Sequence, residues 1–398
     1  MSKMLSMLAS AIGFCAVLAS QASAEMVYHR GNTAEPETLD PNKASTTYEA
    51  NILRDLFEGL VMPDARANII PGVAESWRIS DDQTVYTFKL RADAVWSNGD
   101  PVTADDFVYA FRRLEDPATA AEYASMLYVV KNAEAINAGK MRPEEIGARA
   151  TGAKTLEITL NSPTPYFLEM LTHQATYPVH QASVERLGAD WTKTGNLISN
   201  GPFMLAERVP NDHIKIVKNP RFHDATDVAL DAVIFYPTED RSAAIKRFQA
   251  GELDSNDELP IEQLVELREK FGGQVHIAPY LGVYYCYINL RKAPWSDPQL
   301  RRAISMAIDR EFLATKVWGG AMFPAYGLVS PGIEGYRPYQ AEYADAPEID
   351  REDEAARILE TLGYGPDNPL KLELRYEHFG EQPEYRHCDP GAAAPFRH

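Results

Sequence analysis

The chain has 398 residues, of which 45% are hydrophobic and 24% are charged, and it carries a formal net charge of -18. This composition is typical of a soluble globular protein with enough apolar residues for two or three domains. The acidity argues against a nucleic-acid partner, because binding to phosphate groups needs clustered Lys and Arg side chains.

The first 24 residues have the features of a secretory signal peptide. Lys3 precedes an apolar stretch over residues 5–18, and the segment ends in the small residues Ala22, Ser23 and Ala24, which a signal peptidase accepts. We therefore predict an exported protein that is cleaved after Ala24. A membrane anchor or a buried helix is the alternative, but the apolar stretch is short for crossing a bilayer.

The three cysteines give little support for a metal or redox site. Cys15 lies inside the predicted signal peptide, which leaves Cys286 and Cys388 in the mature chain. One disulfide between them is possible, although a chain of this length does not need it for export. No two cysteines have the C-x-x-C spacing of a zinc or thioredoxin-type site.

The mature chain opens with a predicted strand and a predicted helix. Residues 27–30 read as a strand, and Thr46 and Glu49 have the spacing of a capping box at the start of a helix. Gly59 is placed to end this helix. The helix would bury apolar residues at helical spacing, namely Ile52, Leu53, Leu56, Phe57 and Leu60.

Four aspartates crowd into the next stretch and raise the question of an acidic active site: Asp93, Asp100, Asp105 and Asp106. Asn98-Gly99 is a tight-turn signal, and Thr103 and Asp106 form a second capping box. A calcium-binding loop that started at Asp93 would need glycine at position 98. Asp105 and Asp106 are adjacent on a helix and point in different directions. We therefore interpret the stretch as a turn and a helix start.

The remaining segments alternate between strands and helices. We predict a strand with one buried face around Tyr86, Phe88 and Leu90. Further segments follow in chain order: strand, turn and helix over 154–171, a hairpin over 199–222 with its turn at 210–212, strand, helix and strand over 230–260, a buried strand over 275–290, and a helix over 297–318 with a stripe of Leu300, Ile304, Ala307 and Ile308. This alternation favours an α/β or mixed α+β protein.

The sequence contains no recognisable catalytic motif. It lacks the G-x-S-x-G, G-x-x-x-x-G-K-[ST], H-E-x-x-H and G-x-G-x-x-G patterns. His173 and His180 are seven residues apart with Pro178 between them, which is poor spacing for two metal ligands, and we interpret the histidines as structural or surface residues. An exported hydrolase with an acidic site is therefore the least supported function.

Tyrosines form the other notable cluster. The chain has 20 Tyr, and four of them lie close together in the sequence: Tyr280, Tyr284, Tyr285 and Tyr287. In a strand, Tyr285 and Tyr287 would share one face. These tyrosines could either pack within a sheet or contact a ligand, since a tyrosine ring packs and its hydroxyl forms hydrogen bonds.

Several ordered blocks resemble one family of transport proteins. They include LDPNKASTTYEANILRDLFEGLV, VYTFKLRADAVWSNGDPVTADDFVYAFRRL, AIKRFQAGELD and PYLGVYYCYINLRKAPWSDPQLRRAISMAIDR. From about residue 27 to Tyr376 the chain resembles the family 5 solute-binding proteins of ABC importers, with the oligopeptide-binding members most similar. The resemblance implies a binding protein without catalysis or cofactor.

The resemblance also implies the fold: a bilobed periplasmic-binding-protein fold of type II with an extra subdomain. Residues 25–57 and 182–281 would build the first lobe, residues 58–181 the extra subdomain, and residues 282–376 the start of the second lobe. Residues 377–398 do not resemble the family, and we expect an aberrant tail after an incomplete, truncated second lobe, as a frameshift would produce. Strands of such a lobe would lack partners, so a non-functional fragment is one alternative.

The resemblance implies a periplasmic monomer that binds an oligopeptide and delivers it to an inner-membrane ABC permease complex. The peptide would be held largely by backbone hydrogen bonds in hydrated pockets. Other solutes taken by the family remain open: a dipeptide, a cell-wall peptide, a nickel chelate, haem or an opine. Six ligand-binding residues follow from matching positions: Tyr123, Tyr285, Asn256, Asp257, Ser45 and Thr47. At Ser45 and Thr47 relatives carry glutamate and valine.

Overall fold

The computed structural model describes residues 25–278, 280–333 and 336–374. The predicted signal peptide, the predicted tail over 377–398, Cys15 and Cys388 lie outside these residues. The chain forms two compact units. Among the described residues, the first comprises residues 25–30 together with Glu35–Pro237, and the second comprises Gly31–Ala34 together with the residues from Thr238 to 374. Each is described by itself.

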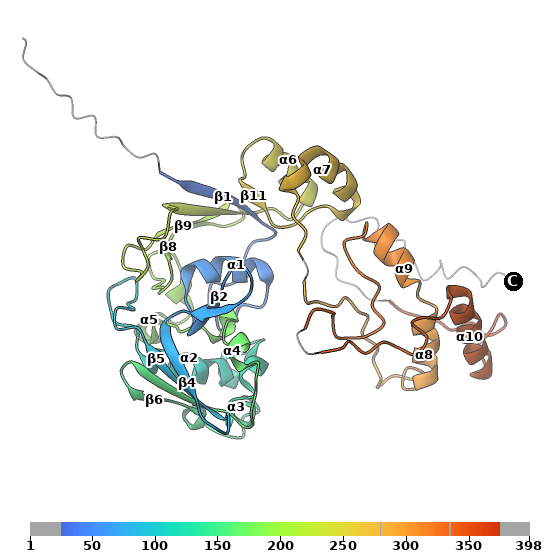
Figure 1. Cartoon of the computed structure of the whole chain (residues 1–398), viewed down its shortest axis with the longest axis horizontal. Helices are drawn as coiled ribbons and strands as arrows, with labels where there is room; N and C mark the ends of the chain where they lie inside the picture. Colours follow the sequence, from blue (N-terminus) through green and yellow to red (C-terminus); the bar gives the residue numbers. More distant parts are fainter. Residues whose placement is uncertain (1–24, 279, 334–335, 375–398) are drawn as a thin grey trace, which may run out of the picture. The chain divides into compact units, whose positions relative to one another are not determined.

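Three sheets are formed by the described residues (Figure 1). The first has five strands in the order β11 (Ser255–Asn256), β1 (Val27–Asn32), β10 (Ala232–Pro237), β9 (His213–Lys218) and β8 (Phe203–Val209). The second has four strands in the order β4 (Ala74–Ile79), β5 (Val85–Leu90), β7 (Thr155–Thr159) and β6 (Ala148–Gly152). The third is a pair, β2 (Val61–Pro63) and β3 (Ile69–Pro71). The mixed α/β character expected from the sequence is confirmed.

Helices of several lengths lie between these strands and after the last of them. The α-helices are α1 (Thr47–Leu56), α2 (Ala104–Glu115), α3 (Ala133–Asn137), α4 (Phe167–Met170), α5 (Gln181–Leu187), α6 (Arg241–Gln249), α7 (Leu264–Phe271), α8 (Pro298–Met306), α9 (Arg310–Phe312) and α10 (Glu348–Thr361). Shorter turns are η1 (Pro117–Thr119), η2 (Ala124–Leu127), η3 (Pro143–Glu145), η4 (Gln174–Thr176), η5 (Gly188–Thr192), η6 (Ile261–Gln263), η7 (Gly272–Gln274) and η8 (Leu313–Val317). No helix in the described part of the chain combines the length and apolarity needed to cross a membrane.

Both capping boxes predicted from the sequence are present. On α1 the Thr46 hydroxyl oxygen accepts a hydrogen bond from the N–H of Glu49, and the Glu49 carboxylate accepts one in return from the N–H of Thr46. On α2 the carboxylate of Asp106 accepts a 2.7 Å bond from the N–H of Thr103. Each box satisfies N–H groups that a helix start leaves without partners.

The position predicted for the end of α1 is wrong. The helix ends at Leu56, and the N–H of Phe57 closes it with a 2.8 Å bond to the carbonyl of Leu53. Gly59 serves a different purpose, because a Cβ there would lie 2.8 Å from the ring of Tyr177. Glycine is therefore required for close packing rather than for a helix end.

Two of the predicted strand features are also confirmed. Tyr86, Phe88 and Leu90 are buried on one face of β5, while the residues between them are more exposed. The hairpin of β8 and β9 turns at Asn211, whose φ of 59° lies in the left-handed region that asparagine tolerates. The local patterns of turn residues and of alternating burial therefore predict both features correctly.

The first unit has a large apolar core. Helix α2 packs on β6 and β7, and its Phe107, Phe111 and Leu114 are fully buried. Each such side chain contributes about 1.5–3 kcal/mol relative to an exposed one. Trp96 and Trp191 are the largest fully buried side chains of this core, with exposures of 1% and 2%. This core fixes the elements that carry the candidate site in the first unit.

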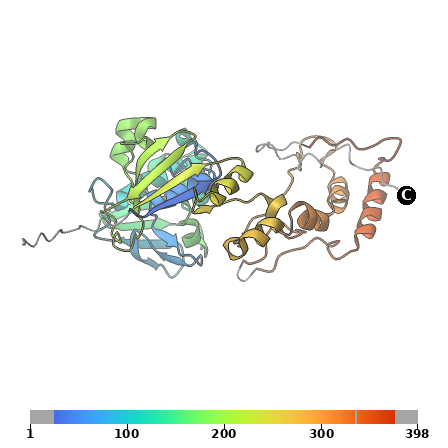
Figure 2. The same ribbon diagram turned by 90° about the horizontal axis from the view of Figure 1, so that it is seen from above.

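The second unit has a much smaller core, formed where α8 packs against α10 (Figures 1 and 2). Ala303, Met306 and Ala355 are its buried members. The stripe predicted for this region is only partly correct. Leu300 is buried, but Ala307 and Ile308 are exposed, because α8 ends at Met306 before the stripe is complete.

The buried strand predicted over residues 275–290 is wrong for the part of this segment that the structure describes. Residues 275–278 and 280–290 contain no strand, and Tyr280, Tyr284 and Tyr287 are 83%, 70% and 86% exposed. A strand needs a neighbour to pair its N–H and C=O groups, and no described strand lies in register with these residues. The apolar pattern alone could not supply that neighbour.

The lobe boundaries predicted from the sequence stay a prediction. All strands of the five-stranded sheet come from within 25–57 and 182–281, and all strands of the four-stranded sheet come from within 58–181. The two compact units divide the chain elsewhere, after Pro237. The strands of these two sheets therefore follow the predicted segments, whereas the division into two compact units does not.

Candidate functional site

The acidic stretch around α2 has a structural role. The Asp106 carboxylate accepts from the N–H and the hydroxyl of Thr103, at 2.7 and 2.9 Å, and from the Trp96 indole at 3.4 Å. Burial raises the pKa of Asp106. Gly99 adopts a φ of 97° in the predicted turn. The interpretation of this stretch as a turn and a helix start is confirmed.

His180 joins the same cluster. Its Nδ1 lies 2.8 Å from the hydroxyl oxygen of Ser183, and its Nε2 lies 3.1 Å from a carboxylate oxygen of Asp100. Hydrogen bonds from Asn98 and then from His180 lower the pKa of Asp100. Among the described residues no group of three or more His, Cys, Asp or Glu side chains is arranged to hold a metal ion.

The first unit brings together two of the predicted ligand-binding residues, Tyr123 and Ser45. Tyr123 precedes η2, and its hydroxyl lies 3.4 Å from the carbonyl oxygen of Ser45. Both residues are half-buried, whereas Thr47, the first residue of α1, is exposed. The Tyr123 hydroxyl and the Ser45 carbonyl thus place a donor and an acceptor together just before α1.

A histidine that sequence reasoning set aside lies against Tyr123. The rings of His173 and Tyr123 have centroids 4.6 Å apart. The Nδ1 of His173 accepts a 3.2 Å bond from the N–H of Ala175, so it carries no proton. Burial, followed by the charge of Arg54, lowers the pKa of His173 to about 4. The ring is therefore neutral at physiological pH, and no sequence spacing could have indicated its contact with Tyr123.

The loop that carries Ser45 is tied to α2 by an ion pair. We call residues 38–46 the Ser45 loop. Arg113 of α2 donates from Nη1 to Asp40 at 2.8 Å and to Asn42 at 2.9 Å, and from Nη2 to the second oxygen of Asp40. The Asn42 amide in turn donates to the carbonyl of Ala175 at 2.9 Å. These contacts hold the loop beside the segment that bears His173.

The other three predicted ligand-binding residues lie in the second unit. Asn256 is in β11, its amide donates to the carbonyl of Glu258, and its neighbour Asp257 is exposed. Tyr285 is 47% exposed, and its hydroxyl lies 2.7 Å from that of Tyr287. Sheet packing does not occupy these tyrosines in the described structure. Contact with a ligand stays a proposal.

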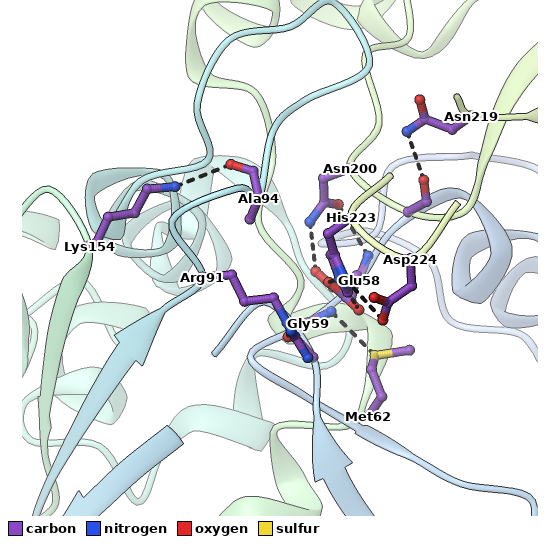
Figure 3. A network of polar contacts seen from close by, with 12 residues as sticks. Glu58, Gly59, Met62, Arg91, Ala94, Lys154, Asn200, Asn219, His223 and Asp224 are labelled. Carbon is purple, nitrogen blue, oxygen red and sulfur yellow. Dashed lines mark hydrogen bonds and ion pairs between the residues drawn. The ribbon is translucent and has the colours of Figure 1, made fainter. Parts of the chain in front are cut away.

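A polar network that sequence reasoning missed lies in the first unit (Figure 3). The Glu58 carboxylate is 2.9 Å from the Nε2 of His223, and the side chain of Asn200 bonds the N–H and the C=O of Glu58 at 3.1 and 2.9 Å. On its other side, His223 Nδ1 lies 3.1 Å from Asp224. Burial raises the pKa of Glu58. Burial alone would lower the pKa of His223, but its bonds with Glu58 and Asp224 raise it.

A sequence model of one protein family matches residues 68–387 of the chain. Its description is "Bacterial extracellular solute-binding proteins, family 5 Middle". The match supports the resemblance found in the sequence blocks, and it extends to residue 387, beyond the end expected near Tyr376.

Individual relatives are similar over most of this chain. The periplasmic murein peptide-binding protein MppA of Escherichia coli (strain K12) is 40% identical over 344 residues, which are 86% of this chain and 64% of that protein. The periplasmic oligopeptide-binding protein OppA of the same organism is 38% identical over 350 residues, or 87% of this chain and 64% of that protein. The chain therefore spans less than two thirds of the length of these relatives.

Solved structures give the same result at the level of the fold. The Escherichia coli murein tripeptide binding protein MppA superposes with a TM-score of 0.83 at 39% identity, covering 88% of this chain and 69% of that one. Haemophilus influenzae OppA in complex with RPPGFSPFR superposes with a TM-score of 0.81 at 38% identity, covering 87% and 68%. The chain belongs to the bacterial extracellular solute-binding proteins of family 5.

Proposed function

We propose that this chain is the substrate-binding component of an ABC importer, which captures oligopeptides in the periplasm and delivers them to a permease complex in the inner membrane. The observation that carries the proposal is its 38% identity to the oligopeptide-binding protein OppA over 350 residues. The family consists of transport binding proteins rather than enzymes. The protein would act as a monomer without a cofactor.

The candidate site supports a peptide as the ligand. The Tyr123 hydroxyl and the Ser45 carbonyl oxygen lie 3.4 Å apart, and the loop that carries Ser45 is held by the buried pair of Arg113 and Asp40. An extended peptide exposes alternating N–H and C=O groups that can pair with such a surface. The six residues proposed to contact the ligand are Tyr123, Ser45, Thr47, Asn256, Asp257 and Tyr285.

Ligand-dependent stability tests the proposal directly. The protein is unfolded in guanidinium chloride, dialysed to remove any peptide that was purified with it, refolded, and melted with and without a library of tri- to pentapeptides. A ligand that binds only the folded protein stabilises it by about 2.7 kcal/mol at a hundred times its Kd. We expect peptides to raise the midpoint of a cooperative melt and free amino acids to leave it unchanged. A cooperative melt that no peptide shifts contradicts the proposal.

A cell-wall peptide is the second candidate ligand. MppA, named for murein peptide binding, is 40% identical over 344 residues. Calorimetric titration with the murein tripeptide and with ordinary tripeptides separates the two candidates by their relative Kd. A third relative, described as a probable deoxycholate-binding periplasmic protein, is 35% identical over 357 residues. Deoxycholate therefore belongs in the same titration as a ligand of different chemistry.

Export and domain organisation complete the proposal. Cleavage after Ala24 would release the mature protein into the periplasm, and sequencing the amino terminus of the protein recovered from periplasmic extract tests the cleavage site. Residues 25–57 and 182–281 would form the first lobe, residues 58–181 the extra subdomain and residues 282–376 the start of the second lobe.

A further inference from the structure

One buried carboxylate holds both ends of the Ser45 loop. Glu49 is 2% exposed on the first turn of α1. Its Oε1 accepts a 3.1 Å bond from the N–H of Thr38. Its Oε2 accepts bonds from the N–H of Ser45 at 2.9 Å, and from the N–H and the hydroxyl of Thr46 at 3.1 and 2.9 Å. Hydrogen bonds to a carboxylate are stronger than those between neutral groups.

These contacts exceed what a helix cap needs. A capping box requires only that the side chain at the third helical position accept from the N-cap N–H, which is the bond between Glu49 and Thr46. The Asp106 box on α2 bonds the N–H and the hydroxyl of Thr103 but no other backbone N–H. The bonds from Thr38 and Ser45 therefore serve the loop and not the helix.

We infer that Glu49 is a positioning residue for ligand binding, which sets the backbone conformation of the Ser45 loop. The inference rests on the proposed function, because Ser45, Thr47 and Tyr123 are ligand-binding residues only if the chain binds a peptide there. By joining Thr38 to Ser45, the carboxylate fixes the carbonyl that lies 3.4 Å from the Tyr123 hydroxyl. A loop ordered before the ligand arrives loses less conformational entropy on binding.

A second, independent anchor makes the inference testable in a folded protein. The middle of the loop is held by Asp40 and Asn42, which bond Arg113. Replacing Glu49 therefore releases the two ends of the loop while its middle stays attached to α2. The variant E49Q keeps the size of the side chain but puts an amide NH₂ beside N–H groups that need an acceptor.

The chain provides a matched control in its second capping box. The variant D106N makes the same acid-to-amide change at the same helix position, far in the sequence from the Ser45 loop. Hydrogen exchange followed by mass spectrometry is measured on the full-length protein and both variants. We expect the peptide covering residues 38–46 to exchange about tenfold faster in E49Q than in the unaltered protein, which corresponds to a 1.4 kcal/mol change in the opening equilibrium, and to be unaffected in D106N. Both variants should melt at a lower temperature, since both weaken a cap.

The affinity of the two variants for a peptide is the second measurement of the test. For the tightest peptide identified in the melt screen, we expect the Kd to rise about tenfold in E49Q and to change less than twofold in D106N. Unchanged exchange over residues 38–46 in E49Q overturns the inference, and so does faster exchange with an unaltered Kd. If the unaltered protein binds no peptide, the proposed function fails, and the exchange comparison still decides whether Glu49 orders the loop. Should E49Q not fold, E49D keeps the charge but shortens its reach, and the same two measurements apply.

Discussion

Glu58 and His223 form an almost fully buried pair between residues 165 positions apart, with their side chains 8% and 4% exposed. Glu58 lies just after the end of α1, and His223 lies in the connection between β9 and β10. The pair therefore joins these two parts of the chain. Asp224 lies 3.1 Å from the other ring nitrogen, and the charge of Arg91 acts on Glu58. The imidazole is therefore flanked by the buried carboxylate of Glu58 and the exposed carboxylate of Asp224.

Removal of the imidazole should destabilise the first unit strongly. In H223A the buried Glu58 carboxylate loses its partner, and we expect the free energy of unfolding to fall by about 3 kcal/mol. Denaturant unfolding measures the change. The control is H276A, because His276 is exposed and its replacement should cost less than about 0.5 kcal/mol. Equal effects of the two substitutions would contradict the assignment of a structural role to the pair.

Glu115 should make stability depend on pH. Its carboxylate is fully buried without a hydrogen-bond partner, and burial raises its pKa from 4.5 to about 8. Between these values the unfolded chain has lost the proton and the folded chain keeps it, so this residue lowers the free energy of unfolding as pH rises from 4.5 to 8. Unfolding by urea at pH 5 and at pH 8 measures the slope.

The variant E115Q removes that titration. We expect its free energy of unfolding to fall less between pH 5 and pH 8 than that of the unaltered protein, by at least about 2 kcal/mol. The comparison of slopes is independent of any constant cost of placing an amide at this position. Parallel pH profiles of the two proteins would mean that Glu115 is not the group responsible.

In the second unit, the hydroxyl of Tyr326 forms hydrogen bonds with one acidic and one basic side chain. Its Oη donates to Glu311 at 2.6 Å and accepts from Arg351 at 2.6 Å, and Arg310 lies 5.0 Å from the ring centroid. Burial, followed by the bond to Glu311, raises the pKa of Tyr326 to about 12, so the hydroxyl stays protonated.

The variant Y326F should therefore weaken the packing of α10. Arg351 is buried and loses one of its hydrogen-bond acceptors, so we expect the free energy of unfolding to fall by about 1–3 kcal/mol. Hydrogen exchange of α10 reports this loss locally. The matched control is Y339F, because Tyr339 is 68% exposed and its hydroxyl should contribute nothing measurable. Faster exchange of α10 in both variants would argue against a specific role for Tyr326.

The Tyr123 hydroxyl should matter for ligand binding more than for folding. Its bond to Ser45 is 3.4 Å long, so Y123F should change the free energy of unfolding by less than about 0.5 kcal/mol. We expect the Kd for peptide, measured by calorimetry, to rise by about tenfold, because a ligand group would lose its hydrogen-bond partner. Y128F is the control: its hydroxyl bonds Asn137 at 2.7 Å and lies outside the proposed site. A Kd unchanged in Y123F would remove Tyr123 from the ligand-binding residues.

Features set by neighbours in the sequence could be predicted from it. The capping boxes at Thr46 and Thr103, and the turn at Asn211, depend on residues within three positions, so their chemistry is visible in the sequence. The alternation around Phe88 likewise identified a half-buried strand. Resemblance to family 5 added the residues that local patterns could not provide, among them Tyr123 and Ser45, which the structure places together.

Features set by distant partners could not be predicted. Glu58 and His223 gave no signal, because nothing in either local pattern specifies a partner 165 positions away. The apolar run around Tyr285 reads as a buried strand only if a neighbouring strand is assumed. The sequence predicts only a structural or surface role for His173, because its contact with Tyr123 depends on the fold of two separate segments.

Two buried tryptophans give the core of the first unit its own optical signature. Trp96 and Trp191, buried in the core of the first unit, should emit at short wavelength and be shielded from iodide, whereas Trp295 and Trp318 of the second unit are partly exposed and should be quenched. Trp77 of the first unit is also partly exposed, so only the shielded component is specific to one unit. Loss of the shielded component marks unfolding of the large core, whatever the state of the smaller one.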